Sequence, residues 1–204
     1  RLTDGNIDNT HINNLYVEID EGATLNNSSF AFSKGESREE IRVRMKGKAS
    51  NVNIDGLILG NKKSKNELLT KVSHLNKDSK SNQNIRIVLD DESRGAFQGK
   101  IRVDQGANNT MASMSGKSLL LDKLSQVYTK PELEILADDV SCSHGLTVGN
   151  LDKEQLFYLC SRGISKKEAE KILIEAFSKI ILENLSNLFK EKVEQLITDY
   201  YEKK

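Results

Sequence analysis

The sequence predicts a mostly β fold: a parallel β-helix (solenoid) over residues 1–150, followed by a C-terminal α-helical domain over residues 151–204. Short segments in which apolar and polar residues alternate recur every ~10 to 15 residues, as expected of strands that bury one face. Two-residue Asn-Gly or Asp-Gly turns are missing between these segments, which disfavours an antiparallel sandwich. Aromatic residues make up only 5% of the chain, whereas Val, Ile and Leu are plentiful, and this favours stacked coils.

Turn residues separate the expected strands, for example Glu21-Gly22, Lys46-Gly47 and Gln105-Gly106. The segments that are predicted as strands are 15–19, 41–45, 52–59, 85–89, 100–104, 119–121 and 133–136. Residues 61–84 are rich in lysine and asparagine, and we expect them to contain a mobile loop.

From Leu151 onward the apolar period becomes helical. Asp152 is placed to cap a first helix that ends at Gly163, because Asp before and Gly after an apolar-periodic run are common helix boundaries. Ser165 and Glu168 form a capping-box pattern that opens a second helix. Apolar residues then follow at helical spacing, at positions 169, 172, 173, 176, 177, 180, 181, 185, 188, 189, 193, 196 and 197. The weakest helical stretch is 184–187, where we expect a break.

The helical segment carries more apolar surface than one neighbouring element needs to cover. The residues that make up this excess are Leu173, Ile174, Phe177, Ile181 and Leu182. Such a surface packs either on the β-domain of the same chain or on a helix of a partner, and the period alone leaves both destinations open.

Composition excludes several classes of function. Thirty basic residues balance thirty acidic ones, so the chain lacks the basic excess of a sequence-independent nucleic-acid binder. No apolar run approaches the ~20 residues that span a bilayer, and no secretory leader is expected. The chain starts at Arg1, which indicates a fragment or a processed chain. Two cysteines in 204 residues point to a reducing compartment.

One short segment carries candidate chemistry, from Ala137 to Gly145. If it is extended, Cys142 and His144 project from the same face of a strand. The two side chains then suit a metal site, a nucleophile with its base, or a small buried thiol beside a structural histidine. Only Asp138 or Asp139 is near enough in the sequence to orient a nucleophile and base.

A closed metal site is not expected within this chain. His11, His74 and Cys160 are distant in sequence from Cys142 and His144, and none of them shows the spacing of a zinc motif. Any metal on Cys142 and His144 therefore needs further ligands, most economically from a second chain.

Two stretches resemble a known family. Lys130 to Phe177 (KPELEILADDVSCSHGLTVGNLDKEQLFYLCSRGISKKEAEKILIEAF) and Arg94 to Ala107 (RGAFQGKIRVDQGA) are similar to the SufB/SufD family, the scaffold subunits of the SUF iron–sulfur cluster assembly machinery. Cys142-Ser143-His144-Gly145 followed by Thr147-Val148-Gly149 resembles the SufD form. The SufB form, which has Glu-His-Glu-Ala at this place, is the alternative within the family.

The resemblance implies a right-handed β-helix and a heterodimer of SufB-like and SufD-like subunits, each docking a SufC-like ABC ATPase. It assigns the cluster-assembly histidine to His144, with Cys142 beside it at the dimer interface and the remaining metal ligands on the partner chain. It also implies a transient iron–sulfur cluster rather than a tightly bound cofactor. The docking surface for the ATPase maps to Phe157, Arg162, Ile172, Leu173 and Phe177.

We therefore expect a non-catalytic scaffold subunit that binds neither nucleic acid nor membrane. A cysteine- or metal-dependent hydrolase built on a β-solenoid is the alternative from another class. The isolated chain is expected to form homodimers when the interface for its partner is left uncovered. An asparagine-rich, proline-poor composition suits an AT-rich genome, which points to a plastid of a eukaryotic parasite or to a bacterial cytoplasm.

Overall fold

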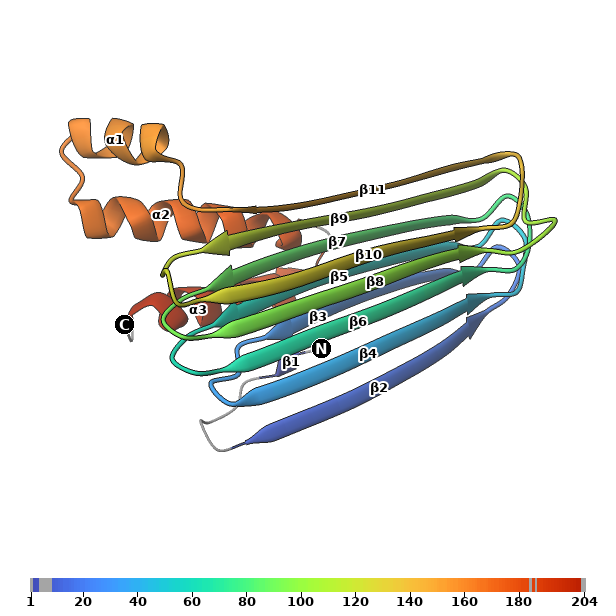
Figure 1. The fold of residues 1–204 in the computed structure, drawn as a ribbon, viewed down its shortest axis with the longest axis horizontal. Coiled ribbons are helices and arrows are strands. Elements are labelled where there is room, and N and C mark those ends of the chain that lie inside the picture. Colours follow the sequence, from blue (N-terminus) through green and yellow to red (C-terminus); the bar gives the residue numbers. More distant parts are fainter. Residues whose placement is uncertain (1, 4–8, 184, 186, 203–204) are drawn as a thin grey trace.

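The computed structural model describes residues 2–3, 9–183, 185 and 187–202. In these residues, eleven strands wind into a parallel solenoid that three α-helices follow (Figure 1). The strands are β1 (Leu2–Thr3), β2 (Thr10–Ile19), β3 (Thr24–Ala31), β4 (Glu36–Met45), β5 (Asn51–Gly60), β6 (Lys65–His74), β7 (Lys80–Leu89), β8 (Arg94–Val103), β9 (Thr110–Leu120), β10 (Gln126–Ile135) and β11 (Val140–Gly149). The helices are α1 (Lys153–Ser161), α2 (Lys166–Lys179) and α3 (Asn187–Glu202). The predicted fold class, a mostly β solenoid followed by helices, is confirmed.

Consecutive strands alternate between two parallel sheets. The odd sheet has the order β1-β3-β5-β7-β9-β11, and the even sheet has the order β2-β4-β6-β8-β10. Along one position of the even sheet, Ile19, Met45, His74 and Val103 are neighbours at separations of 26, 29 and 29 residues, and Ile135 follows after 32. Because the coils differ in length, the repeat is irregular in the sequence although the strands stack in register.

The core lies between the two sheets and is built from the side chains that point inward. Ile41, Val72 and Ile101 of the even sheet and Ile54 and Ile87 of the odd sheet are buried in one apolar cluster. Each inward residue stacks on its counterpart in the next coil, so burial repeats along the whole solenoid. Stability therefore comes from contacts between coils, and each coil depends on its two neighbours.

The prediction that residues 61–84 contain a mobile loop is wrong. This segment contains all of β6 and the first half of β7, and both strands pair along their full length. Its inward positions include polar residues that bond each other inside the solenoid. Thr70 Oγ1 donates to Gln83 Oε1, and Ser37 Oγ donates to Asn66 Oδ1, each at 2.5 Å. These paired side chains give the segment the composition of a loop while it has the structure of a strand.

A buried histidine closes the turn between β6 and β7. The His74 side chain is fully buried, with Nδ1 2.7 Å from Ser79 Oγ and Nε2 2.8 Å from Ser81 Oγ. Ser79 Oγ also lies 3.3 Å from Thr110 Oγ1 in the next coil. Burial without a carboxylate partner lowers the pKa of His74 to about 4, so the imidazole is neutral at physiological pH.

The helix boundaries follow the caps that the sequence predicts. Asp152 Oδ1 accepts from the backbone N–H groups of Glu154 and Gln155, and α1 is followed by Gly163, whose φ is +89°. Ser165 Oγ accepts from the Glu168 N–H at the start of α2. The expected break is confirmed, since α2 gives way to a short 3₁₀ turn (η1, Ile180–Leu182) before α3 begins at residue 187. Residues 184 and 186 of that stretch lie outside the described residues.

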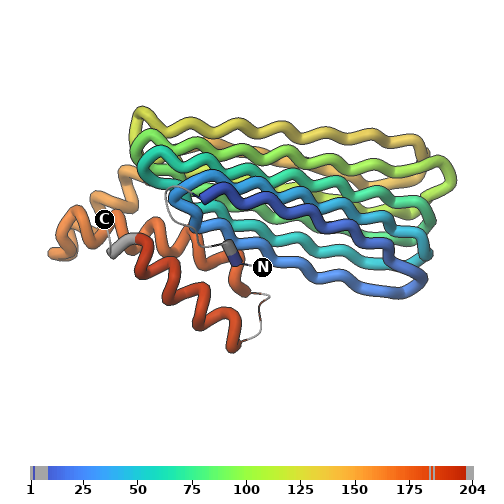
Figure 2. Tube along the Cα trace, turned by 90° about the horizontal axis from the view of Figure 1, so that it is seen from below, coloured from blue at the N-terminus to red at the C-terminus, as the bar shows by residue number. Residues whose placement is uncertain are grey.

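Helices α2 and α3 cover part of the outer face of the odd sheet (Figure 2). Ile174 and Ile181 from the α2 region and Val193 and Ile197 from α3 pack in one cluster with outward-facing residues of the strands. Those strand residues are Phe30, Leu57, Leu59, Val88 and Leu119. Much of the surplus apolar surface is therefore buried within the chain. The helices within the described part are too short or too polar to span a membrane.

The buried imidazole of His74 makes stability depend on pH. The folded pKa of about 4 lies below the ordinary value of 6.5, so between these values the unfolded chain binds more protons and stability falls as the pH falls. Between about pH 7 and about pH 5 this linkage costs about 2 kcal/mol. Urea unfolding should show that the His74→Gln variant, which does not titrate, loses about that much less than the wild type. Equal losses in both proteins would contradict the assignment.

Candidate functional site

The last coil leaves one end of the solenoid open. Strand β11 is the final strand of the odd sheet and pairs with β9, whereas β10 is the final strand of the even sheet and pairs with β8. In the described residues, no further strand covers the other edge of either one (Figure 1). Each edge therefore presents a row of backbone N–H and C=O groups that a further strand can bind.

Cys142 and His144 lie on β11 and face the same side of it. Cys142 is in register with Ala112, and His144 is in register with Met114, both of which are buried in the core. The two side chains therefore project from β11 on the lumen side of the sheet, as the spacing predicted. Because β11 is the last strand, this lumen side is exposed at the open end.

The surroundings of the two side chains differ. Cys142 is half-buried and packs against the core, whereas His144 is exposed. The structure gives no hydrogen bond between these two described residues, so they do not form a preassembled nucleophile and base. Asp138 and Asp139 lie in the turn before β11, and the backbone C=O of Asp139 accepts from the Asn109 N–H.

Burial keeps Cys142 protonated. Loss of hydration raises the pKa of the Cys142 thiol, and a hydrogen bond with the backbone of Ala112 opposes this shift only in part. The nucleophile and the metal ligand are both the thiolate form, so the thiol must lose its proton before it acts. A metal ion that binds the sulfur, or a basic group placed beside it at the open end of the solenoid, favours the loss of the thiol proton.

The other candidate ligands lie elsewhere in the fold. His74 is enclosed in the turn between β6 and β7, His11 is on β2 at the opposite end of the solenoid, and Cys160 is on α1. Within the described part of the chain, no three His, Cys, Asp or Glu side chains are close enough to hold a metal ion. Cys142 and His144 therefore offer an incomplete ligand set.

The open end also exposes apolar side chains of the last coil. Val127, Leu133 and Ile135 on β10 and Val140 and Leu146 on β11 contact the core on one side and are only half-buried. An additional layer of apolar side chains would complete their burial. The end of the solenoid is thus an apolar surface that surrounds one thiol and one imidazole.

The residues that were predicted to dock an ATPase divide into two groups. Phe157 and Arg162 are exposed around α1, which buries none of its residues, and the Arg162 guanidinium lies 5.3 Å from the centre of the Tyr158 ring. Ile172 is also exposed. By contrast, Leu173 and Phe177 line a groove of about 410 Å³ between α2 and the ends of β9 and β11.

Phe177 also has a role within the chain. The Arg86 guanidinium of β7 lies 5.2 Å from the centre of its ring, and Phe177 packs against the cluster that joins the helices to the odd sheet. A substitution at Phe177 therefore disturbs the attachment of α2 as well as the surface. Of the predicted docking residues, Phe157 gives the cleanest test because its side chain is exposed and α1 buries none of its residues.

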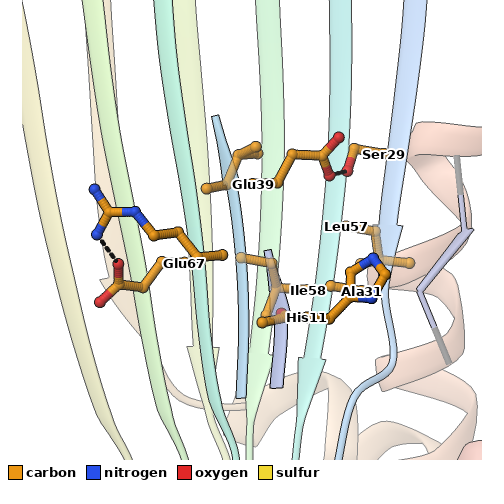
Figure 3. Close-up of a pocket in the computed structure, with 10 residues that line it drawn as sticks. His11, Ser29, Ala31, Glu39, Leu57, Ile58 and Glu67 are labelled. Atoms are coloured by element: carbon orange, nitrogen blue, oxygen red, sulfur yellow. Dashed lines mark hydrogen bonds and ion pairs between the residues drawn. The ribbon is translucent and has the colours of Figure 1, made fainter. Parts of the chain in front are cut away.

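Sequence reasoning missed a polar cluster inside the first coils (Figure 3). Glu39 points into the lumen, where it accepts hydrogen bonds from Ser29 Oγ and, at 3.2 Å, from Asn13 Nδ2. His11 lines the same pocket, which has a volume of about 10 Å³ and so holds at most a water molecule. The signal was available, since Glu39 occupies an inward position between Ser37 and Ile41. We assign this cluster to the internal structure of the solenoid.

The chain is similar in sequence to known proteins of one family over most of its length. The family described as "SUF system FeS cluster assembly, SufBD core domain" matches residues 1–177. The iron-sulfur cluster assembly protein SufD of Escherichia coli is 38% identical over 165 residues, which are 81% of this chain and 39% of that protein. The chain thus spans about two fifths of the length of this relative.

Two eukaryotic relatives match shorter stretches. Protein ABCI7, chloroplastic, of Arabidopsis thaliana is 40% identical over half of this chain and 21% of its own length. The iron-sulfur cluster assembly protein SufD of Plasmodium falciparum is 30% identical over 64% of this chain and 9% of its own length. With a family match over 177 residues and the similarity to SufD, the chain belongs to the SufBD family of SUF iron–sulfur cluster assembly proteins.

Proposed function

We propose that this chain is a non-catalytic scaffold subunit on which an iron–sulfur cluster assembles between two subunits. The observation that carries the proposal is the position of Cys142 and His144, which face the lumen side of an uncovered last coil with an incomplete ligand set. Family membership supports the role in cluster assembly. The similarity to proteins named SufD supports a SufD-like rather than a SufB-type subunit.

The partner at the open end is a SufB-like subunit. A second solenoid that meets β10 and β11 would pair the free strand edges and bury the half-exposed apolar residues there. It would also bring ligands to Cys142 and His144. In the absence of such a subunit, a second copy of this chain satisfies the same edges, so the isolated chain forms a homodimer.

In this arrangement His144 is an iron ligand or a positioning base. Its exposed imidazole reaches the interface, and the neutral form binds the metal. Cys142 contributes its sulfur once binding displaces the proton, because metal ligation and loss of the thiol proton are coupled. The cluster is cargo that is made and passed on, and it is not a resident cofactor of this chain.

The SufC-like ATPase docks on α1. This short helix presents Phe157, and Arg162 at its C-cap, without burying any residue of its own, which is unusual for a helix that serves only its own fold. The groove beside Leu173 continues the surface toward β11, so a subunit docked on α1 contacts the strand that carries the candidate ligands. Bacterial and chloroplastic relatives support a bacterial cytoplasm or a plastid as the location.

The hydrolase alternative predicts a reactive Cys142, which the raised thiol pKa disfavours. In the Cys160→Ser variant, which retains one thiol, alkylation by iodoacetamide at about pH 7 should proceed several-fold more slowly than alkylation of free cysteine. Mass spectrometry of the modified protein measures the rate. A rate equal to or above that of free cysteine would favour the nucleophile instead.

The role of His144 is tested by cluster assembly. In a complex reconstituted with SufB-like and SufC-like subunits, His144→Ala should lower the assembly rate about tenfold or more, because a ligand or base at the interface is lost. Absorbance of the forming cluster measures the rate. The matched control is His11→Ala, which removes the histidine of the polar cluster at the opposite end of the solenoid. Normal assembly by the His144 variant would refute the role.

Docking of the ATPase is tested at Phe157, whose side chain is 75% exposed. Phe157→Asp places a charge in the proposed interface and should weaken binding of the SufC-like subunit at least tenfold, since an apolar contact is lost and a charge is buried. Phe189→Asp is the control, because Phe189 is a comparably exposed aromatic residue on α3. Light scattering after size-exclusion chromatography detects the complex. Equal binding by both variants would place the ATPase elsewhere.

A further inference from the structure

The last strand of the even sheet carries the single proline of the chain, Pro131, in the middle of β10. At one end of this strand the Gln126 N–H donates to the Ser93 C=O, just before β8. At the other end the Leu136 N–H donates to the Val103 C=O, the last of β8. Residues of a parallel strand direct their backbone groups alternately to its two sides, and the register between β8 and β10 is continuous. The even-numbered residues of β10 therefore bond to β8, and Pro131 faces the free edge.

Pro131 interrupts the free edge of β10. A proline has no backbone N–H, and its ring occupies the place from which another residue would donate to an incoming strand. The neighbouring edge positions, Thr129 and Leu133, keep their N–H groups. β11 contains no proline, so its free edge is continuous from Val140 to Gly149. Of the two edges at the open end, only that of β11 is able to pair with a partner along its whole length.

One position of each sheet forms a series of pairs across the lumen. In the coil of β6 and β7, Thr70 Oγ1 donates to Gln83 Oε1 at 2.5 Å. In the next coil, Gly99 of β8 is in register with Thr70, and Met114 of β9 is in register with Gln83. This second pair is also in contact, because a Cβ atom on Gly99 would lie only 2.5 Å from the sulfur of Met114. The even sheet thus accommodates the side chain opposite it, by a hydrogen bond in one coil and by the lack of a side chain in the other.

The last coil continues this series with Pro131 and His144. Pro131 is in register with Gly99, and His144 is in register with Met114, so the two residues lie opposite each other at the open end. The proline ring has no group that hydrogen-bonds an imidazole, in contrast to the hydroxyl of Thr70 in the same row. The wall opposite His144 is therefore apolar, and it belongs to the strand whose edge is interrupted.

We propose that Pro131 is a positioning residue for His144, which prevents a partner strand from closing over the middle of β10 and so keeps an opening beside the imidazole. This inference rests on the proposed function, in which the open end is the interface where the cluster forms. A partner that paired with both edges along their whole length would seal the lumen around His144. With Pro131 in place, β11 supplies continuous pairing that holds the partner, and the interrupted edge of β10 leaves a path by which iron and sulfide reach the imidazole.

The Pro131→Ala variant tests the proposal, because alanine restores an N–H at the middle of the edge and removes the ring. We expect the variant to bind a SufB-like subunit roughly fivefold more tightly, since one hydrogen bond is gained. In the complex completed with a SufC-like subunit, its rate of cluster assembly should fall about tenfold, because the opening beside His144 is closed. Calorimetric titration measures the affinity, and absorbance of the forming cluster measures the rate. Affinity and rate thus change in opposite directions, whereas loss of a residue that only supports the fold would lower both.

Thr129→Ala is the matched control. Thr129 also faces the free edge of β10, and its substitution leaves the N–H in place, so affinity and assembly rate should stay within about twofold of the wild type. Amide hydrogen exchange gives a second readout. In the wild-type complex, the amides of Thr129 and Leu133 should exchange faster than the edge amides of β11, and in the Pro131→Ala complex they should become equally protected.

The outcomes separate this inference from the function on which it rests. Weaker binding by Pro131→Ala, or cluster assembly as fast as in the wild type, would overturn the role of Pro131 and leave the proposed interface intact. Failure of the wild-type chain to bind the SufB-like subunit would overturn the proposed function, and this inference with it. The first failure is seen only in the variant, whereas the second is seen in the wild type.

Discussion

The structure depends on the in-register stacking of parallel coils. Each coil buries its inward side chains on the coil before it and the coil after it, as Val43, Val72 and Ile101 do along the even sheet. Stacking alone does not end such a solenoid, because the inward side chains of the last coil are as apolar as those of the other coils. The open end at β10 and β11 is the direct consequence, and Cys142 and His144 lie there because β11 is the last strand.

Sequence reasoning found the strands whose inward positions are apolar, and it missed those whose inward positions are polar. β5 and β7 contain the alternation of Val52, Ile54, Ile85 and Ile87, whereas β3 and β6 place Ser29, Asn66 and Thr70 inside. Such residues are stable there because a partner from another strand bonds them. Pairings of this kind depend on register, and register is not visible when the repeat varies in length.

The candidate site was predictable in part for the same reason. A spacing of two residues on a strand fixes a shared face, so the common orientation of Cys142 and His144 followed from the sequence. The difference in their exposure did not follow, because it depends on contacts in the folded chain: of the two, only Cys142 packs against the core cluster. The same limit applies to the apolar residues of the C-terminal helices. Ile174 is buried on outward-facing strand residues whereas Phe157 is exposed, and the helical period is the same for both.

Amide hydrogen exchange of the chain, alone and mixed with a SufB-like subunit, tests the central claim most directly. The free edges and half-buried side chains of β10 and β11 predict that complex formation slows exchange in these two strands. Exchange in β2, at the opposite end of the solenoid, should remain unchanged. A complex that protects β2 and leaves β11 as accessible as in the free chain would contradict the assignment of the open end as the assembly interface.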